Sequence, residues 1–190
     1  MVSLEPQFFI FVAVFSSFLG AVLIGMASQR RKNLREAITM FTAIFTYLST
    51  IFLTRSLLSG VTPVVKLVRL SSNVDFYLKA DPFGAIFANL SSFLWVFVSL
   101  YSVGYMRALK EKRQTRFYAM FAVAIGSAIG VAYAGNLLTL YMFYEILTFS
   151  TYPLVAHKET EDALNAGRKY LAYLLSGAGA VLFGIVGTYL

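Results

Sequence analysis

Glu145 is the residue whose type and position point most directly to chemistry. It lies near the middle of an apolar segment from Asn136 to Val155, where an acidic side chain in a membrane costs at least about 2.5–3.5 kcal/mol. Burial disfavours a charged carboxylate and a nearby cation favours it, so a buried acid with a cationic neighbour can exchange a proton near neutral pH. Glu145 is therefore a candidate proton carrier. The structural alternative is a permanently protonated side chain that donates one hydrogen bond to an adjacent helix.

Hydroxyl groups share the predicted helix face of Glu145. Tyr141 lies one turn before it, Thr148 three residues after it and Tyr152 seven residues after it, and these spacings place side chains on one side of a helix. We expect this face to point into the protein. Pro153 is expected to end or kink the same helix.

Lys169 is the second candidate. The preceding Thr160-Glu161-Asp162 is typical of a helix N-cap followed by acids in the first turn, so Lys169 is predicted to lie two turns inside that helix. It could be the cationic neighbour in proton movement, or a lysine that extends to the cytoplasmic interface. His157, the single histidine, lies in a polar connection and fits a residue at headgroup level better than a relay member.

The composition requires a membrane environment for these residues. The chain is 58% hydrophobic and 13% charged, against roughly 45–50% and about 25% in soluble domains. Soluble and disordered chains are excluded. The basic residues lie in short runs between apolar segments, so nucleic-acid binding is not expected. With no cysteine, thiolate metal sites are excluded. No cofactor or metal is expected, and redox chemistry would belong to partner subunits.

Six segments are predicted to span the membrane, one of them around a charge. Twelve of the 16 basic residues lie on alternate connections, which predicts that these connections are cytoplasmic and that both termini are extracytoplasmic. The predicted fold is all-α, a polytopic transmembrane helix bundle that forms a single domain over residues 1–190. The segments are Phe8–Ala27, Ala37–Thr54, Phe83–Tyr105, Phe117–Ala134, Asn136–Val155 and Tyr170–Leu190.

The connections carry further signals. Between Gly60 and Asp81, the alternating segment Val64–Leu70 predicts a short β-hairpin with its turn at Ser71–Asn73. Asp81 before Pro82 predicts a helix cap. The basic run from Arg107 to Arg116 could bind anionic lipid or a peripheral subunit, although topology alone explains it. Small residues spaced by four predict close helix packing, at Ala122, Gly126, Gly130 and Ala134.

Several stretches carry a family resemblance, namely Asp81–Gly84, Tyr101–Met106, Arg116–Tyr118, Tyr144–Leu147 and Ala166–Leu171. In these stretches the chain resembles the N-terminal portion of the antiporter-like proton-translocating subunits shared by respiratory complex I, multisubunit Mrp-type sodium/proton antiporters and membrane-bound hydrogenases. The resemblance implies that Glu145 is a principal proton-handling residue and that Lys169 matches a lysine that recurs in the sixth helix. The family's lysines of the seventh and eighth helices and its second, inverted repeat are absent here.

These observations predict a multi-pass subunit of an ion-translocating complex in the cell (inner) membrane, with Glu145 as the proton carrier. Sodium/proton exchange or a redox module would be the coupled process. Expected partners are other membrane subunits, peripheral redox subunits and the lipid bilayer. The alternative is a structural and assembly subunit without its own ion path. Because the chain ends with an apolar segment at Leu190, we expect it to be the front part of a larger architecture that does not work as a stand-alone enzyme.

Overall fold

The computed structural model describes residues 6–27, 31–69 and 75–189. These residues form six helices, with a two-stranded hairpin between the second and the third. In chain order the elements are α1 (Pro6–Met26), α2 (Lys32–Leu58), β1 (Val64–Arg69), β2 (Asp75–Lys79), α3 (Pro82–Ala108), α4 (Gln114–Ala132), α5 (Leu137–Val155) and α6 (Glu161–Tyr189).

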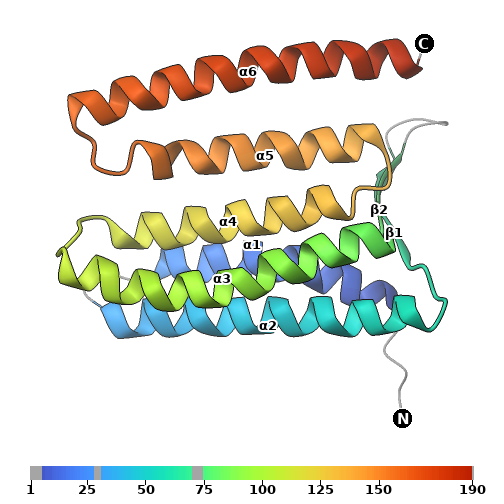
Figure 1. The fold of residues 1–190 in the computed structure, drawn as a ribbon, viewed down its shortest axis with the longest axis horizontal. Coiled ribbons are helices and arrows are strands. Elements are labelled where there is room, and N and C mark those ends of the chain that lie inside the picture. Colours follow the sequence, from blue (N-terminus) through green and yellow to red (C-terminus); the bar gives the residue numbers. More distant parts are fainter. Residues whose placement is uncertain (1–5, 28–30, 70–74, 190) are drawn as a thin grey trace.

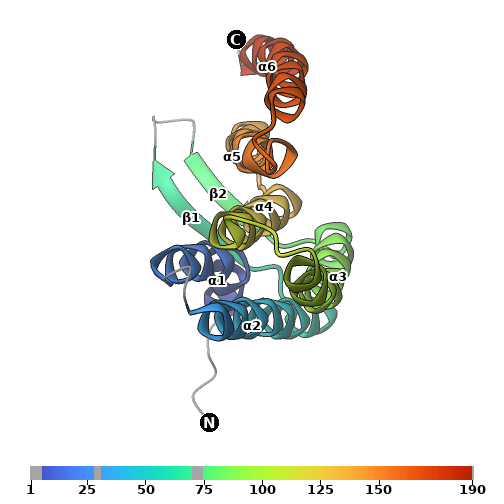
Figure 2. The same cartoon turned by 90° about the vertical axis from the view of Figure 1, so that its left-hand side faces the viewer.

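The helices lie side by side along one long axis, and successive helices run in opposite directions (Figure 1). Seen end-on, α1 to α4 form a compact group, and α5 and α6 follow as a row on one side of it (Figure 2). Helix α4 is central, because it packs against α1, α3 and α5. Helix α6 packs against α5 and leaves most of its own surface uncovered.

The helices meet the requirements for a membrane bundle. All except α5 are long and apolar enough to cross a membrane. Helix α5 contains Glu145 and several hydroxyl groups, which lower its hydropathy, but it lies alongside α4 and α6 in Figure 1. The prediction of an all-α polytopic bundle is confirmed. That α5 also crosses the membrane is inferred from its position between α4 and α6.

Large apolar side chains point outward from the bundle. Phe41, Phe83 and Phe183 are 70%, 83% and 85% exposed, whereas Thr46, Ser92 and many alanines are buried. Such a distribution would be unfavourable in water, where large apolar groups drive folding by leaving the solvent. It fits lipid, where small and hydroxyl residues let helices pack closely.

Helix boundaries follow the predicted caps. The Asp81 carboxylate accepts a hydrogen bond from the Gly84 backbone amide at 2.7 Å and caps α3. The Thr160 hydroxyl accepts from the Ala163 amide at 3.3 Å, so α6 begins at Glu161 as the cap predicted. Helix α2 begins at Lys32 rather than at the predicted Ala37, because Arg35 and Glu36 find partners inside the bundle.

The predicted hairpin is also present. Strands β1 and β2 are antiparallel, with Val64 opposite Lys79 and Arg69 opposite Asp75. The turn predicted at 71–73 lies outside the described residues. The hairpin is attached to the α4–α5 connection by backbone hydrogen bonds, from Lys79 to the Tyr133 carbonyl at 2.8 Å and from Gly135 to the Tyr77 carbonyl at 3.0 Å. It lies at the end of the bundle where α1 begins and α6 ends (Figure 1). Which side of the membrane this end faces remains a prediction.

Close packing of α4 depends on glycine. A β-carbon at Gly126 would collide with Ser17 and Phe18 of α1, and one at Gly130 would collide with the Phe143 ring of α5. The small-residue ladder therefore packs two neighbouring helices against α4, as predicted.

Candidate functional site

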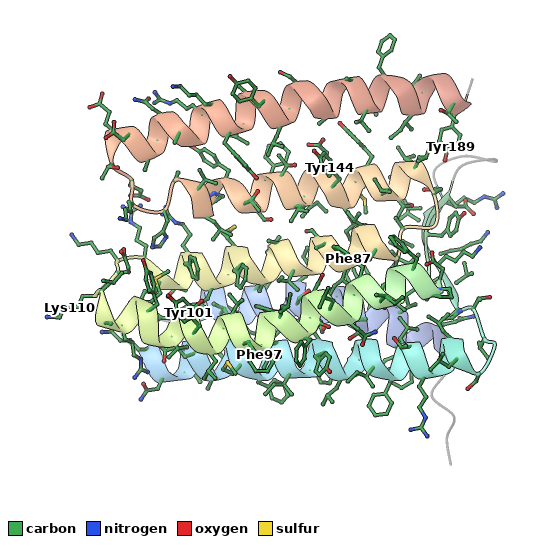
Figure 3. The ribbon with its side chains drawn as sticks, viewed as in Figure 1. Phe87, Phe97, Tyr101, Lys110, Tyr144 and Tyr189 are labelled. Atoms are coloured by element: carbon green, nitrogen blue, oxygen red, sulfur yellow. The ribbon has the colours of Figure 1, made fainter. Side chains whose placement is uncertain are left out.

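Glu145 lies inside α5, on the side that faces α6. Tyr152, seven residues on, contacts the backbone position of Gly167 in α6, and the neighbouring Thr151 hydroxyl is 2.6 Å from the Tyr170 hydroxyl. Side chains of both helices occupy the space between them in Figure 3. Glu145 is the single acidic or basic residue of α5. The expectation that its face points into the protein agrees with this arrangement.

One carboxylate oxygen of Glu145 lacks a partner. The Glu145 side chain is partly buried, and its Oε1 atom is enclosed without a hydrogen bond from any described residue. A buried carboxylate oxygen without a donor is costly, whereas a protonated carboxyl or an added donor removes that cost. The enclosed oxygen can therefore accept a hydrogen bond from a donor outside the described residues.

Lys169 is not brought to Glu145. The residues of α6 that turn toward α5 include Gly167, Tyr170 and Ala178, whereas Lys169 is exposed. Glu145 lies ten residues before the end of α5 and Lys169 eight residues after the start of α6, so at 1.5 Å per residue they are about 15 Å and about 12 Å from the connection. The two residues lie at a similar distance from the α5–α6 connection, but Lys169 does not lie on the face of α6 that contacts α5.

His157 lies in the α5–α6 connection, against the end of α4. Its ring packs edge-on against Phe117 with centroids 5.5 Å apart, and its backbone carbonyl accepts a hydrogen bond from Arg116 at 3.1 Å. Burial, and then the charge of Arg116, lowers the pKa of His157 below its ordinary value. A neutral histidine that holds two connections together fits a structural residue better than a proton relay.

Glu159 completes this contact between the α3–α4 and α5–α6 connections. Its carboxylate accepts hydrogen bonds from Arg113 and Arg116. The hydrogen bond from Arg116, with the nearby charge of Arg113, lowers the pKa of Glu159, so the carboxylate stays ionised at neutral pH. The two basic residues therefore contribute to the fold as well as to topology.

Sequence reasoning missed a buried ionic cluster at the same end of the bundle. Arg35 and Glu36 of α2 are 1% and 5% exposed. The Glu36 carboxylate accepts two hydrogen bonds from the Arg107 guanidinium of α3, and Arg35 lies 3.5 Å from it. Arg35 also donates to the Gln114 side-chain oxygen of α4 at 2.5 Å. This Arg35–Glu36–Arg107 cluster joins α2, α3 and α4.

Hydroxyl and amide groups form a seam between α1, α2 and α3 outside the ionic cluster. The Ser16 and Thr46 hydroxyls are 2.8 Å apart, the Thr50 and Ser92 hydroxyls are 3.0 Å apart, and the Asn89 amide donates to Thr54 at 2.5 Å. Hydrogen bonds between helices of this kind stabilise membrane bundles by roughly 0.6 kcal/mol each. Most of these hydroxyls also bond the carbonyl three or four residues earlier, so the seam is a packing feature.

The fold and the site define a class, namely multi-pass helical membrane proteins with an acid inside the bundle, one oxygen of which has no partner among the described residues. Two family models match this chain, "NADH:quinone oxidoreductase/Mrp antiporter, TM" over residues 134–190 and "NADH-Ubiquinone oxidoreductase (complex I), chain 5 N-terminus" over residues 68–118. The chain therefore belongs to the antiporter-like family of membrane subunits, as its resemblance predicted.

Curated relatives and a solved structure agree with this family. The chain is 31% identical over 147 residues to the Na(+)/H(+) antiporter subunit A1 of Staphylococcus aureus strains RF122 and Newman. The match takes in 75% of this chain and 18% of those relatives, so the chain spans about a fifth of their length. A chain of the archaeal membrane-bound sulfane sulfur reductase has the same fold, with a TM-score of 0.75 at 19% identity over 94% of this chain and 36% of that one.

Proposed function

We propose that this chain forms part of a proton-translocating membrane subunit, in a multisubunit complex related to Mrp antiporters, with Glu145 as the proton carrier. The observation that carries the proposal is the Glu145 carboxyl, enclosed in α5 with one oxygen unpartnered. A carboxyl group can hold a proton on an oxygen that no donor occupies, and this geometry supports the proposal. Names of the relatives, which include a sodium/proton antiporter subunit, support ion exchange as the coupled process.

A pathway needs groups on both sides of the carrier. The hydroxyls of Thr148 and Tyr152 follow the Glu145 face of α5 toward the α5–α6 connection, and Tyr141 lies one turn on the other side of Glu145. Helix α6 leaves the opposite surface open, since Tyr173 and Phe183 are 80% and 85% exposed. We propose that further helices of the same subunit or of a neighbouring one cover this surface and supply the rest of the path.

Lys169 is proposed as a cation on the path rather than as a direct partner of Glu145. It shares the depth of Glu145 and faces the surface that further helices would cover. A lysine there would change its proton affinity with its surroundings, which a relay requires. Lys169→Gln should reduce ion movement, whereas Lys158→Gln, an exposed cation of the preceding connection, should leave it unchanged. Equal effects of the two variants would indicate that Lys169 is a lysine at the membrane–water interface and not part of the path.

The direct test is ion uptake by inverted membrane vesicles that contain the native complex. Glu145→Gln keeps the size and the hydrogen bonding of the side chain but cannot release a proton. We expect loss of uptake with the complex intact on a native gel, and Glu145→Asp should retain part of the activity. Uptake at the level of the wild type in Glu145→Gln would assign the proton path to other residues. Repeating the assay with and without sodium distinguishes proton transport from sodium/proton exchange.

A structural and assembly role is the second candidate. The broad uncovered surface of α6 favours it, because α6 buries a smaller share of its span than the other candidate spans of the described residues and so leaves room for neighbouring subunits. In that case Glu145→Gln would leave transport unchanged, while substitutions on the α6 surface would release neighbouring subunits from the complex.

A further inference from the structure

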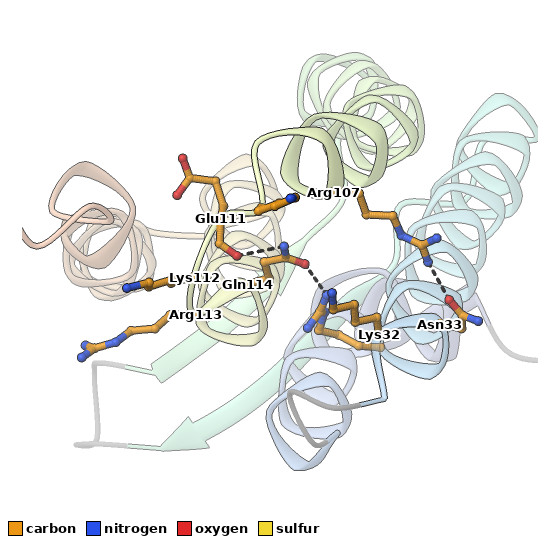
Figure 4. A pocket seen from close by; sticks show the side chains of 9 residues that line it. Lys32, Asn33, Arg107, Glu111, Lys112, Arg113 and Gln114 are labelled. Atoms are coloured by element: carbon orange, nitrogen blue, oxygen red, sulfur yellow. Dashed lines mark hydrogen bonds between the residues drawn. The ribbon is translucent and has the colours of Figure 1, made fainter.

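We propose that the ends of α2, α3 and α4 form a binding site for the phosphate headgroup of an anionic phospholipid. A cavity of about 770 Å³ opens there, within the 300–1,000 Å³ range of small-ligand sites. Figure 4 shows it between the start of α2, the end of α3 and the α3–α4 connection. It is lined by Lys32, Asn33, Arg35, Arg107, Lys110, Glu111, Lys112, Arg113 and Gln114. This proposal does not depend on proton transport by Glu145.

The charges around the cavity are unbalanced. Six of its lining residues are basic and one, Glu111, is acidic. Glu36 neutralises part of the charge of Arg35 and Arg107, and Glu159 binds Arg113. Lys32, Lys110 and Lys112 form no ion pair with any residue that the structure describes. Three cations at one site without an ion-pair partner among the described residues attract an anionic phosphate group.

Two helix N-termini add to this potential. Helices α2 and α4 both begin at the cavity, at Lys32 and Gln114, and neither has a side chain that caps its first amides. Helix N-termini carry partial positive charge and bind anions through free amide groups. The α3–α4 connection makes the required sharp turn with positive φ angles at Lys110 and Arg113. Arg35, 1% exposed, supplies a fixed guanidinium in the wall.

The surroundings favour a lipid over an acidic protein. Tyr101 and Tyr105 of α3 stack on each other with centroids 5.8 Å apart and are 68% and 47% exposed, six and two residues before Arg107. Exposed tyrosines at a helix end mark the headgroup level of a membrane. Leu34 and Leu109 are also exposed beside the cavity, so acyl chains can lie on the bundle below a bound headgroup. Lys110 extends outward from this end of the bundle (Figure 3).

Native mass spectrometry of the purified complex in neutral detergent tests the site. Phosphatidylglycerol is titrated against phosphatidylcholine with the same acyl chains, and lipid retained on this subunit is counted. We expect retention of phosphatidylglycerol and at least about tenfold weaker binding in Lys32→Gln/Lys110→Gln/Lys112→Gln. The matched control, Arg55→Gln/Arg69→Gln/Lys79→Gln, removes three cations from the opposite end and should bind like the wild type.

Several outcomes would overturn the proposal. These are equal retention of both lipids, equal weakening in the control, unchanged binding in the triple variant, and displacement of the lipid by millimolar inorganic phosphate, which would indicate a site for a soluble anion. Loss of a peripheral subunit from the triple variant, with lipid retention unchanged, would assign the surface to a protein. If the triple variant does not assemble, Lys32→Gln and Lys110→Gln are measured singly, and each should weaken retention severalfold.

Discussion

Glu36 and Glu145 are both acidic residues inside the helix bundle, but their surroundings differ. Those of Glu36 fit a structural ion pair, and those of Glu145 fit a candidate proton carrier. Glu36 binds Arg107 through both oxygens and lies beside Arg35, so its charge is compensated by fixed partners. Glu145 has an enclosed oxygen without a partner among the described residues. A carboxylate bound by fixed cations holds helices together, whereas a carboxyl oxygen without a donor leaves room for a proton or another ligand.

The two acids also lie in regions that pack differently. Glu36 is surrounded by α2, α3 and α4, which pack tightly with α1 around two apolar clusters. Glu145 lies between α5 and the sparsely covered α6. We infer that α1 to α4, with α5 packed against α4, form the stable part of the chain, and that the proposed proton carrier lies where α6 joins it.

The largest effect on stability is expected from Glu36→Gln. The substitution leaves Arg35 and Arg107 without their anion, and breaking a buried ion pair costs about 3–5 kcal/mol. Arg107 is half exposed, so we expect the lower end of this range and a loss of assembled complex on native gels. Asp162→Asn, which removes an exposed acid of α6, is the control. An unchanged melting temperature for Glu36→Gln would refute the structural role of the cluster.

A smaller loss is expected from Gly130→Ala. The added methyl group meets the Phe143 ring at the contact between α4 and α5, and overpacking of this kind costs about 1–3 kcal/mol. Gly104→Ala is the matched control, because no atom lies within 4 Å of a β-carbon there. Thermal unfolding of both variants in the same detergent measures the difference. Equal melting temperatures would show that α4 and α5 adjust easily, and would weaken the contrast between the two regions.

The smallest effect is a pH dependence at His157. Burial and Arg116 lower its pKa in the folded state, while Glu111 and Glu159 oppose the shift. The unfolded chain therefore binds a proton at higher pH, near 6.5, and the contribution of His157 to stability is full above that pH and declines as pH falls below it. The melting temperature of the wild type should fall more between pH 7.5 and pH 5.5 than that of His157→Gln. Parallel pH profiles would contradict this.

Local sequence signals predicted much of the fold. Alternation over Val64–Leu70 predicted the hairpin, Asp81 and Thr160 predicted helix starts, and the spacing of Gly126 and Gly130 predicted the close contacts of α4. Each of these signals lies within a few residues of its consequence. Glu145 was equally visible, because an acid within an apolar segment is unusual by itself.

The ionic cluster could not be predicted in the same way. Arg35 and Glu36 lie just before the second apolar segment, where hydropathy alone predicts a polar connection. Their partners Arg107 and Gln114 are more than 70 residues away in the chain, and no local pattern connects them. The signal that could have found them is an Arg-Glu pair directly before one apolar span and an arginine directly after another. The sequence also could not show how Lys169 lies relative to Glu145. Residue spacing predicts how far each lies from the α5–α6 connection, but which face of α6 is exposed depends on helix packing.

Proton uptake measured in parallel for Glu145→Gln and Glu36→Gln, divided by the amount of assembled complex in each vesicle preparation, tests the central contrast most directly. We predict that Glu145→Gln abolishes uptake per assembled complex, whereas Glu36→Gln lowers the amount of complex but leaves uptake per complex close to that of the wild type. The contrasting result, normal uptake per complex in Glu145→Gln, would show that the unpartnered acid of α5 does not carry the proton.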